Sequence, residues 1–129
     1  MMAIRCLVVT PERTQLDAEV DFLTLPMFDG ELGVGHGRAA MIGRLGYGPL
    51  RLRRAGVTSE YYIDGGFAQV ENDVVSVLTS RAVPIEEMKR DAAEQALADA
   101  LAMPGGNADS LALRQTALMR ARGMLRSSQ

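Results

Sequence analysis

The chain has 129 residues, 47% of them hydrophobic and 23% charged, and a formal net charge of −2, which predicts a folded single domain or a small domain with an appendage. Domains that bind nucleic acid normally carry a basic excess, so the acidic balance argues against a nucleic-acid partner. The single cysteine, Cys6, rules out an internal disulfide, and one Cys with one His is too few for a structural zinc site.

The first 83 residues are expected to form an all-β domain, either a small sandwich or a barrel. Short apolar or alternating runs are separated by turn residues, and ten of these 83 residues are glycine. Asn72-Asp73 is typical of a two-residue hairpin loop, and Asp64-Gly65-Gly66 is expected to form a turn before a strand. The expected strands lie at residues 3–9, 20–25, 39–42, 50–53, 60–63, 67–70 and 74–78.

The remaining residues, 84–129, are expected to form a second domain, an antiparallel α-helical hairpin. Residues 85–101 contain no Gly or Pro and are rich in Ala, Glu, Leu and Met, which favour a helix. A proline directly before this stretch suits the first turn of the helix. The second helix is expected to begin at a cap formed by Asn107 or Asp109 and to run to about Arg126.

The two expected helices carry opposite charge. Residues 85–101 have five acidic and two basic side chains, a sum of −3, whereas residues 108–129 have four basic and one acidic side chain, a sum of +3. This difference predicts ion pairs between the helices. Because exposed ion pairs are each worth less than ~1 kcal/mol, a hairpin held by such pairs and by alanine contacts could open.

Residues 29–41 read DGELGVGHGRAAM, with glycines at positions 30, 33, 35 and 37. Their spacing matches neither a P-loop, which needs a Lys and a hydroxyl, nor a dinucleotide fingerprint, which needs a βαβ unit. We therefore expect the glycines to form tight turns. His36 could act as a general base, but no Ser or Cys has the sequence context of a nucleophile beside it, so we expect a surface histidine and no catalytic residue.

Three motifs in register, together with the order of the two domains, resemble the epsilon subunit family of rotary F-type ATP synthases. The motifs are DGELGV at residues 29–34, GGFAQV at 65–70 and VSVLT at 75–79, followed by the Ala-rich hairpin. The resemblance covers nearly the whole chain. It implies a non-catalytic central-stalk subunit that contacts the gamma subunit and the membrane c-ring and helps to couple proton-driven rotation of the ring to ATP synthesis.

The same resemblance implies residues that contact the c-ring or the stalk. Glu31 matches the family's acidic contact residue in the ring-facing loop, and His36 and Arg38 stand where the family usually has Pro and His. All three are expected contacts. Ala40 replaces a second proline of the family pattern, so the loop is expected to be less rigid. Arg38, unlike a histidine, keeps its charge at every physiological pH.

In bacterial and chloroplast members of the family, the hairpin can leave the sandwich and block ATP hydrolysis. The resemblance therefore implies that the basic helix contacts the alpha/beta catalytic head through Arg114, Arg120, Arg122 and Arg126.

Some members also bind regulatory ATP through a pattern close to [IL]-D-x-x-R-A. The candidates here are Ile85, Glu86 and Lys89, with Arg120 on the second helix. Glu and Lys replace the Asp and the Arg of the pattern, and Lys lacks the planar fork of Arg, so neither ATP nor another cofactor is expected.

Two alternatives stay open beside the rotary-synthase subunit. The glycine-rich loop could be the nucleotide site of a small transferase or hydrolase with His36 as its base, or the chain could be an unattached β-sandwich adaptor. No run of 18 apolar residues occurs, so no membrane-spanning helix is expected. The resemblance implies a peripheral position, through the complex, at the cytoplasmic face of the bacterial inner membrane.

Overall fold

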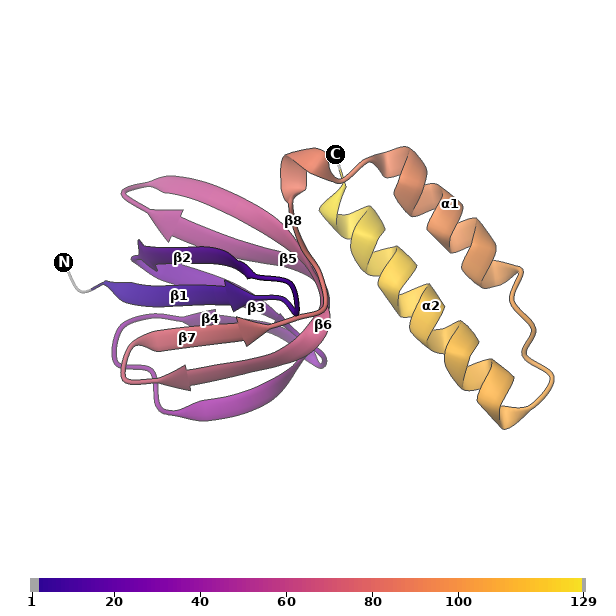
Figure 1. Cartoon of the computed structure of the whole chain (residues 1–129), viewed down its shortest axis with the longest axis horizontal. Coiled ribbons are helices and arrows are strands. Elements are labelled where there is room, and N and C mark those ends of the chain that lie inside the picture. Colours follow the sequence, from indigo (N-terminus) through magenta and orange to yellow (C-terminus); the bar gives the residue numbers. More distant parts are fainter. Residues whose placement is uncertain (1–2, 129) are drawn as a thin grey trace.

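The computed structural model describes residues 3–128, which form a β-sandwich followed by a helical hairpin, as expected (Figure 1). The strands are β1 (Ile4–Val9), β2 (Thr14–Val20), β3 (Phe22–Met27), β4 (Gly30–Val34), β5 (Met41–Arg54), β6 (Val57–Glu71), β7 (Val74–Leu78) and β8 (Ala82–Pro84). The helical segments are a 3₁₀ turn η1 (Ile85–Glu87), α1 (Arg90–Leu101) and α2 (Ala108–Ser127). Residues 1, 2 and 129, at the outer ends of the two expected domains, lie outside the described part. The boundary that the sequence suggested between these domains, between residues 83 and 84, falls inside β8.

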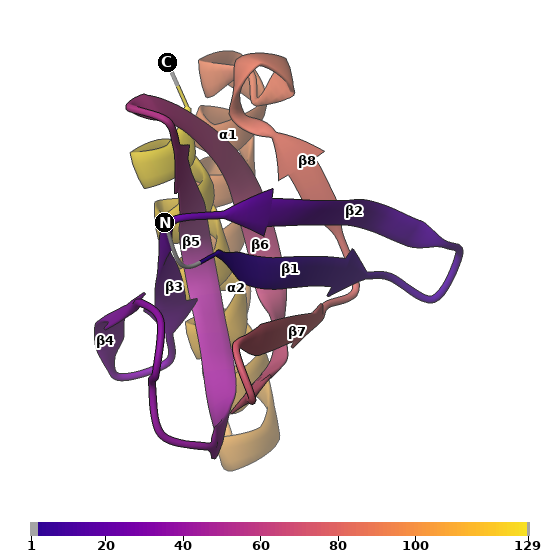
Figure 2. The same ribbon diagram turned by 90° about the vertical axis from the view of Figure 1, so that its left-hand side faces the viewer.

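All of these strands belong to one sheet that folds over on itself. The strand order is β2-β1-β7-β6-β5-β3-β4, with β8 paired to β6. Adjacent strands are antiparallel except β1 and β7, which run parallel. Figure 2 looks along the molecule from the end of the sandwich and shows β1 and β2 crossing in front of β5 and β6, with the hairpin behind. The two layers enclose a core that includes Ile4, Val8, Leu25, Leu50 and Val77, all fully buried.

The longest strands, β5 and β6, form one hairpin around which the other strands are arranged. Strand β3 pairs with β5, whereas β7 and β8 pair with different parts of β6. The loop that connects β5 to β6 is only Ala55 and Gly56. Four of the separate short strands expected from the sequence are segments of these two long strands. Asp64-Gly65-Gly66, expected as a turn, lies inside β6, where the two glycines have φ values of 71° and 111°. Glycines at such positions let a strand bend without ending.

The strand at the edge of the sheet, β2, was not expected from the sequence. Apart from its last residue, Val20, it is exposed or half-buried, and it pairs with β1 along its length. The expected strand at residues 20–25 is also divided, because the chain passes at Asp21 from β2, beside β1, to β3, beside β5. There the Asp21 backbone N–H donates to the Arg53 carbonyl, and its carboxylate accepts from the Ala55 N–H at 2.8 Å.

The first helix begins later than the sequence suggested. Pro84 ends β8 instead of opening the helix, residues 85–87 form η1, and Met88 is extended. The side chain of Met88 is 4% exposed and packs against the hairpin, so tertiary packing overrides the helix-forming tendency of this stretch. The second helix agrees with the expectation: the Asn107 carboxamide oxygen accepts from the Ser110 N–H at 2.9 Å, and the helix ends at Ser127.

The hairpin packs on the sandwich through α2 and has its own small apolar cluster. Helix α2 lies between β5 and α1, as Figure 1 shows. The cluster consists of Tyr62 from β6 with Met88, Ala93 and Met124, and it is distinct from the sandwich core. Within residues 3–128 no ion pair joins α1 to α2, although the two helices pack together. The prediction of ion pairs between the acidic and the basic helix is therefore wrong, and in this part of the chain the only ion pair of α2 is with the sandwich.

Candidate functional site

Glu31 and Arg38 line one open groove on the sandwich. Glu31 lies on β4, and Arg38 lies in the loop that leads from β4 to β5. The groove has a volume of about 600 Å³, and Phe28 and Ile42 supply apolar side chains to its wall. These two side chains are 45% and 73% exposed, so the groove combines two acidic and two basic side chains with uncovered apolar surface. Such a combination suits contact with another protein.

Glu31 is oriented by a basic neighbour. Its carboxylate accepts from Arg51 Nη1 at 2.9 Å, and Arg51 Nε lies 3.7 Å from Glu60. Arg51 comes from β5 and Glu60 from β6, so two strands hold the side chain that borders the groove. Because the Glu31 side chain is 61% exposed, this ion pair is screened and adds little stability, and it engages only Oε2 of the carboxylate.

The glycine-rich stretch is a strand followed by a short turn, so it is less turn-like than the sequence suggested. Residues 30–34 form β4, and only residues 36 and 37 form the turn beyond it. A Cβ at Gly33 would lie 2.7 Å from the ring of Phe22, so this glycine makes room for an aromatic ring. His36 does not line the groove of Glu31 and Arg38. Its Nδ1 contacts the carboxylate of Asp73 in the β6–β7 turn, which also accepts from the Gly37 N–H at 2.8 Å.

An ion pair attaches α2 to the sandwich. Arg120 Nε donates to Asp64 Oδ1 at 2.9 Å, and the hydroxyls of Tyr62 and Ser80 donate to the same carboxylate at 2.8 and 3.2 Å. Burial and the neighbouring Asp64 carboxylate raise the pKa of Tyr62, so its phenol stays protonated and donates. Burial alone would lower the pKa of Arg120, but Asp64 outweighs it and raises that pKa. The guanidinium also lies 5.2 Å from the ring centre of Tyr47.

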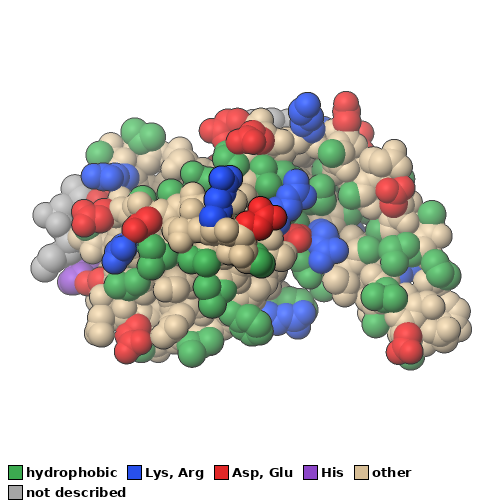
Figure 3. Space-filling view, viewed as in Figure 1, with side chains coloured by type: hydrophobic (Ala, Val, Ile, Leu, Met, Phe, Trp, Pro, Cys, Tyr) green, Lys and Arg blue, Asp and Glu red, His purple; other side chains and the backbone are tan. Residues whose placement is uncertain are grey.

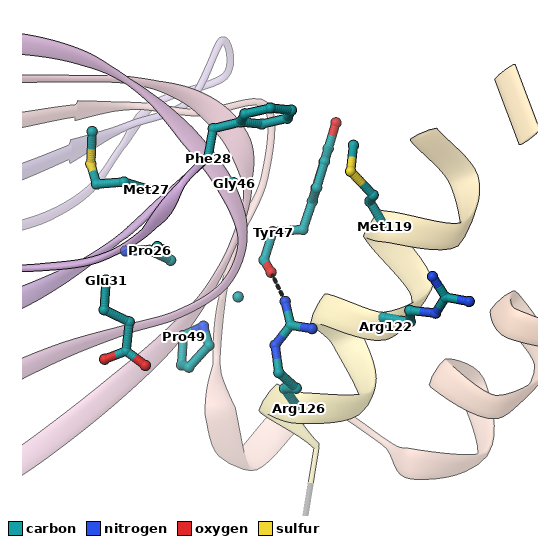
Figure 4. A pocket seen from close by; sticks show the side chains of 12 residues that line it. Pro26, Met27, Phe28, Glu31, Gly46, Tyr47, Pro49, Met119, Arg122 and Arg126 are labelled. Carbon is teal, nitrogen blue, oxygen red and sulfur yellow. Dashed lines mark hydrogen bonds between the residues drawn. The ribbon is translucent and has the colours of Figure 1, made fainter. Parts of the chain in front are cut away.

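A second attachment lies further along α2. Arg126 Nη2 donates to the backbone carbonyl of Tyr47 at 2.9 Å (Figure 4). Gly123 faces the same segment, and a Cβ there would lie 2.6 Å from the Tyr47 carbonyl carbon, so only glycine lets α2 approach β5 this closely. Beside these contacts is a pocket of about 370 Å³ lined by sandwich residues and by Met119, Arg122 and Arg126.

The four arginines of α2 have different surroundings. Arg120 and Arg126 bond to the sandwich, Arg114 Nη2 approaches the Leu101 carbonyl at 3.5 Å, and Arg122 is exposed beside the pocket. Figure 3 shows Lys and Arg side chains, in blue, gathered where the hairpin meets the sandwich. The proposed inhibitory role of these residues stays a prediction.

The candidates for nucleotide binding come from two parts of the hairpin, and one of them is already engaged by the sandwich. Ile85 and Glu86 lie in η1 and Lys89 is the cap residue of α1, whereas Arg120 is engaged by Asp64 of the sandwich. An ATP molecule bound to all four would have to compete with that ion pair. Among residues 3–128 no group of three His, Cys, Asp or Glu side chains could hold a metal ion. In the same part of the chain, no helix is both long and apolar enough to cross a bilayer.

Sequence reasoning missed the residues that attach the hairpin. Asp64 was interpreted as a turn residue, and Tyr62 and Gly123 were given no role. A glycine inside a helix costs about 1 kcal/mol relative to alanine, so Gly123 was the one signal that the sequence offered. The partner of Arg120 lies 56 positions away in the chain and has no local signature.

Comparison with known proteins identifies the family. The family model described as "ATP synthase, Delta/Epsilon chain, beta-sandwich domain" matches residues 3–85. An ATP synthase epsilon chain of Rhodopirellula baltica is 58% identical over 128 residues, which cover 99% of this chain and 100% of the relative. One of Granulibacter bethesdensis is 42% identical over 94 residues, covering 72% of this chain and 70% of the relative.

Solved structures agree with this comparison. A chain in the Euglena gracilis mitochondrial ATP synthase, in a structure of its OSCP/F1/c-ring, superposes with a TM-score of 0.84 at 27% identity, covering 95% of this chain and 79% of that one. A chain of the central stalk/c-ring of the Tetrahymena thermophila mitochondrial ATP synthase, 14% identical with a TM-score of 0.74, shows the same fold over 99% of this chain and 98% of that one. With its sandwich, its hairpin and full-length relatives of this kind, the chain belongs to the ATP synthase epsilon chain family.

Proposed function

We propose that this chain is a non-catalytic subunit of the central stalk of a rotary ATP synthase and couples proton-driven rotation of the c-ring to ATP synthesis. The full-length similarity to an epsilon chain carries this proposal. It is further supported by the Euglena neighbour, whose structure contains F1 and a c-ring. Family membership favours this function over a nucleotide-binding enzyme built on the glycine-rich loop and over a free β-sandwich adaptor.

The c-ring is proposed to contact the groove of Glu31 and Arg38. The groove offers acidic and basic side chains beside exposed Phe28 and Ile42, which is the chemistry of a protein contact. His36 would act differently, by holding the loop through Asp73. These contacts with Asp73 restrain the loop in place of the prolines of the family pattern, so the loop need not be more mobile than in relatives.

Contact at the groove can be tested in the assembled synthase. Glu31→Gln or Arg38→Glu is expected to lower the number of protons pumped per ATP hydrolysed, because the first removes a charge of the contact and the second reverses one. Glu12→Gln is the matched control, since Glu12 is exposed outside the groove. Unchanged coupling in both groove variants would contradict this contact.

The gamma subunit is a proposed partner as well, and mixing it with this chain should give one complex in gel filtration instead of two separate peaks.

The hairpin is proposed to be a detachable inhibitor of ATP hydrolysis by the alpha/beta head. Its apolar cluster is distinct from the sandwich core, which allows release without unfolding of the strands. Release would also free Arg120 and Arg126, so that all four arginines of α2 could meet acidic segments of the head. A chain ending at residue 87 keeps β8, whose Ala82 belongs to the sandwich core. In the assembled complex this truncation should raise ATP hydrolysis, and an unchanged rate would mean that the hairpin does not inhibit.

Two finer points belong to the same proposal. We infer a peripheral position at the cytoplasmic face of a bacterial inner membrane, supported by the bacterial relatives, and fractionation of the native membranes would test it.

We also infer that regulatory ATP does not bind at Ile85, Glu86, Lys89 and Arg120, because the Arg120 guanidinium is already paired with Asp64. Equilibrium dialysis with labelled ATP would contradict this inference if it gave saturable binding that Lys89→Ala abolished.

A further inference from the structure

Three hollows meet at Phe28. The groove of Glu31 and Arg38, the pocket beside Arg126 and a third hollow of about 510 Å³ next to α2 all have Phe28 in their walls. The surface around Phe28 therefore continues from the sandwich onto the hairpin. We call it the Phe28 surface and define it by Phe28, Ile42 and Arg44 from the sandwich and Met119, Arg122 and Arg126 from α2.

The Phe28 surface is basic and apolar, although the whole chain has a net charge of −2. Phe28, Ile42 and Met119 are 45%, 73% and 36% exposed. Within residues 3–128 neither Arg44 nor Arg122 has an acidic partner, and Arg126 bonds only to a backbone carbonyl. Of the acids in the adjoining groove, Glu31 is already paired with Arg51, and Asp29 has no ion pair within the described residues, so the three arginines leave the surface with a net positive charge. A ligand for this surface must bring negative charge together with apolar side chains.

The hollowed shape of the Phe28 surface and the position of Arg44 over the Phe28 ring favour a protein segment over a lipid surface as the ligand. The site is hollowed and about 370 Å³ of it forms a pocket, whereas a flat bilayer would touch only its rim. The ring of Phe28 also lies beneath the Arg44 guanidinium, 4.0 Å from the ring centre, and so is not positioned to insert into lipid.

We propose that the Phe28 surface binds an acidic, partly apolar segment of a partner subunit and that this binding holds the hairpin on the sandwich. Half of the surface lies on α2, so the segment finds its whole site only when the hairpin is docked. By linkage, the segment stabilises the docked hairpin by the same factor by which docking strengthens the segment's binding. The inference rests on the proposed detachable hairpin and adds what controls its release.

The test uses the full chain in the assembled synthase. A photoreactive p-benzoylphenylalanine is placed at position 28 in one sample and at position 119 in another, and the cross-linked peptides are identified by mass spectrometry. Both positions are expected to label one segment of one subunit, with more Asp and Glu than Lys and Arg. Arg122→Glu should lower the yield from position 28 by at least about tenfold, because it places like charges together. Arg54→Glu makes the same charge change at the β5–β6 turn and should leave the yield unchanged.

The remaining outcomes overturn the proposal. Labelling of lipid would show that the surface contacts the membrane instead of a protein segment. Labelling of a basic segment, or labelling of different subunits from the two positions, would exclude binding of a single acidic segment. A hairpin-releasing change such as Gly123→Ala should also lower the yield from position 28, so an unchanged yield would exclude the coupling. If the chain still assembles with gamma and the c-ring in these cases, the proposed function stands and only this inference fails. If the chain does not assemble, both fail.

Discussion

Replacing Gly123 with alanine tests whether close approach of α2 to β5 holds the hairpin in place. Alanine favours the helix itself by about 1 kcal/mol relative to glycine. However, its Cβ would lie 2.6 Å from the carbonyl carbon and 2.7 Å from Cβ of Tyr47. The obstacle is mainly strand backbone, which cannot rotate away as a side chain can. Overpacking of this kind costs about 1–3 kcal/mol, which lowers the docking equilibrium by about 5- to 150-fold. The helix is present whether or not it is docked, so its added propensity does not offset this loss.

Hydrogen exchange of the full chain, followed by mass spectrometry, measures the effect. In the Gly123→Ala variant, amides around Tyr62 and along the second half of α2 are expected to exchange faster, while the sandwich core keeps its protection. Gly106→Ala is the matched control, because Gly106 lies between the helices and a Cβ there would meet no atom within 4 Å. Wild-type exchange in the Gly123 variant, or equal acceleration in the control, would refute the claim that this contact governs docking.

Three further predictions concern the isolated chain. Arg120→Ala should weaken docking by about 1–2 kcal/mol, because it leaves the Asp64 carboxylate, only 13% exposed, without its cation; Arg122→Ala should not, and equal exchange rates in both variants would refute the role of this ion pair. Gly66→Ala should lower the melting temperature of the sandwich more than Gly56→Ala does, since both have positive φ but only at position 66 does a Cβ meet the backbone of Leu78 and Thr79; equal melting temperatures would show that the clash is relieved. Burial raises the pKa of Cys6 to about 12, so at pH 8 its thiol is protonated and should react with a disulfide reagent only at the rate of unfolding; fast reaction in the native state would contradict its burial.

Features that depend on neighbouring residues could be predicted from the sequence. Asn72 and Asp73 form the expected two-residue loop, both with positive φ, because these residue types tolerate that conformation. Asn107 caps α2 because its own side chain reaches an N–H three residues further on. In both cases the stabilising group lies within a few residues of the backbone that it stabilises, so the local sequence contains the whole interaction.

Features that depend on distant contacts could not be predicted. Strand β2 is half-exposed and lies at an edge, so its own pattern is weak and its pairing with β1 decides its conformation. Met88 is extended because its side chain is buried against the hairpin, although the surrounding residues favour a helix. The same reason explains the missed site: the net charges of the helices suggested partners for Arg120 within the hairpin, but a carboxylate on β6 is better placed and more buried.

The attachment of the hairpin is separate from the core of the sandwich. It consists of a small cluster around Tyr62, the close approach of α2 to β5 at Gly123, one ion pair at Arg120 and one hydrogen bond from Arg126 to a backbone carbonyl. Polar contacts of this kind are worth about 1 kcal/mol each, and a coupling free energy between two sites is typically about 1–3 kcal/mol. Under the proposed function, a partner that contacts both the sandwich and the hairpin would shift the hairpin between docked and released states, whereas a hairpin that shared the core of the sandwich could be released only by unfolding the strands. The separation of the two apolar clusters is thus the structural feature on which a detachable hairpin depends.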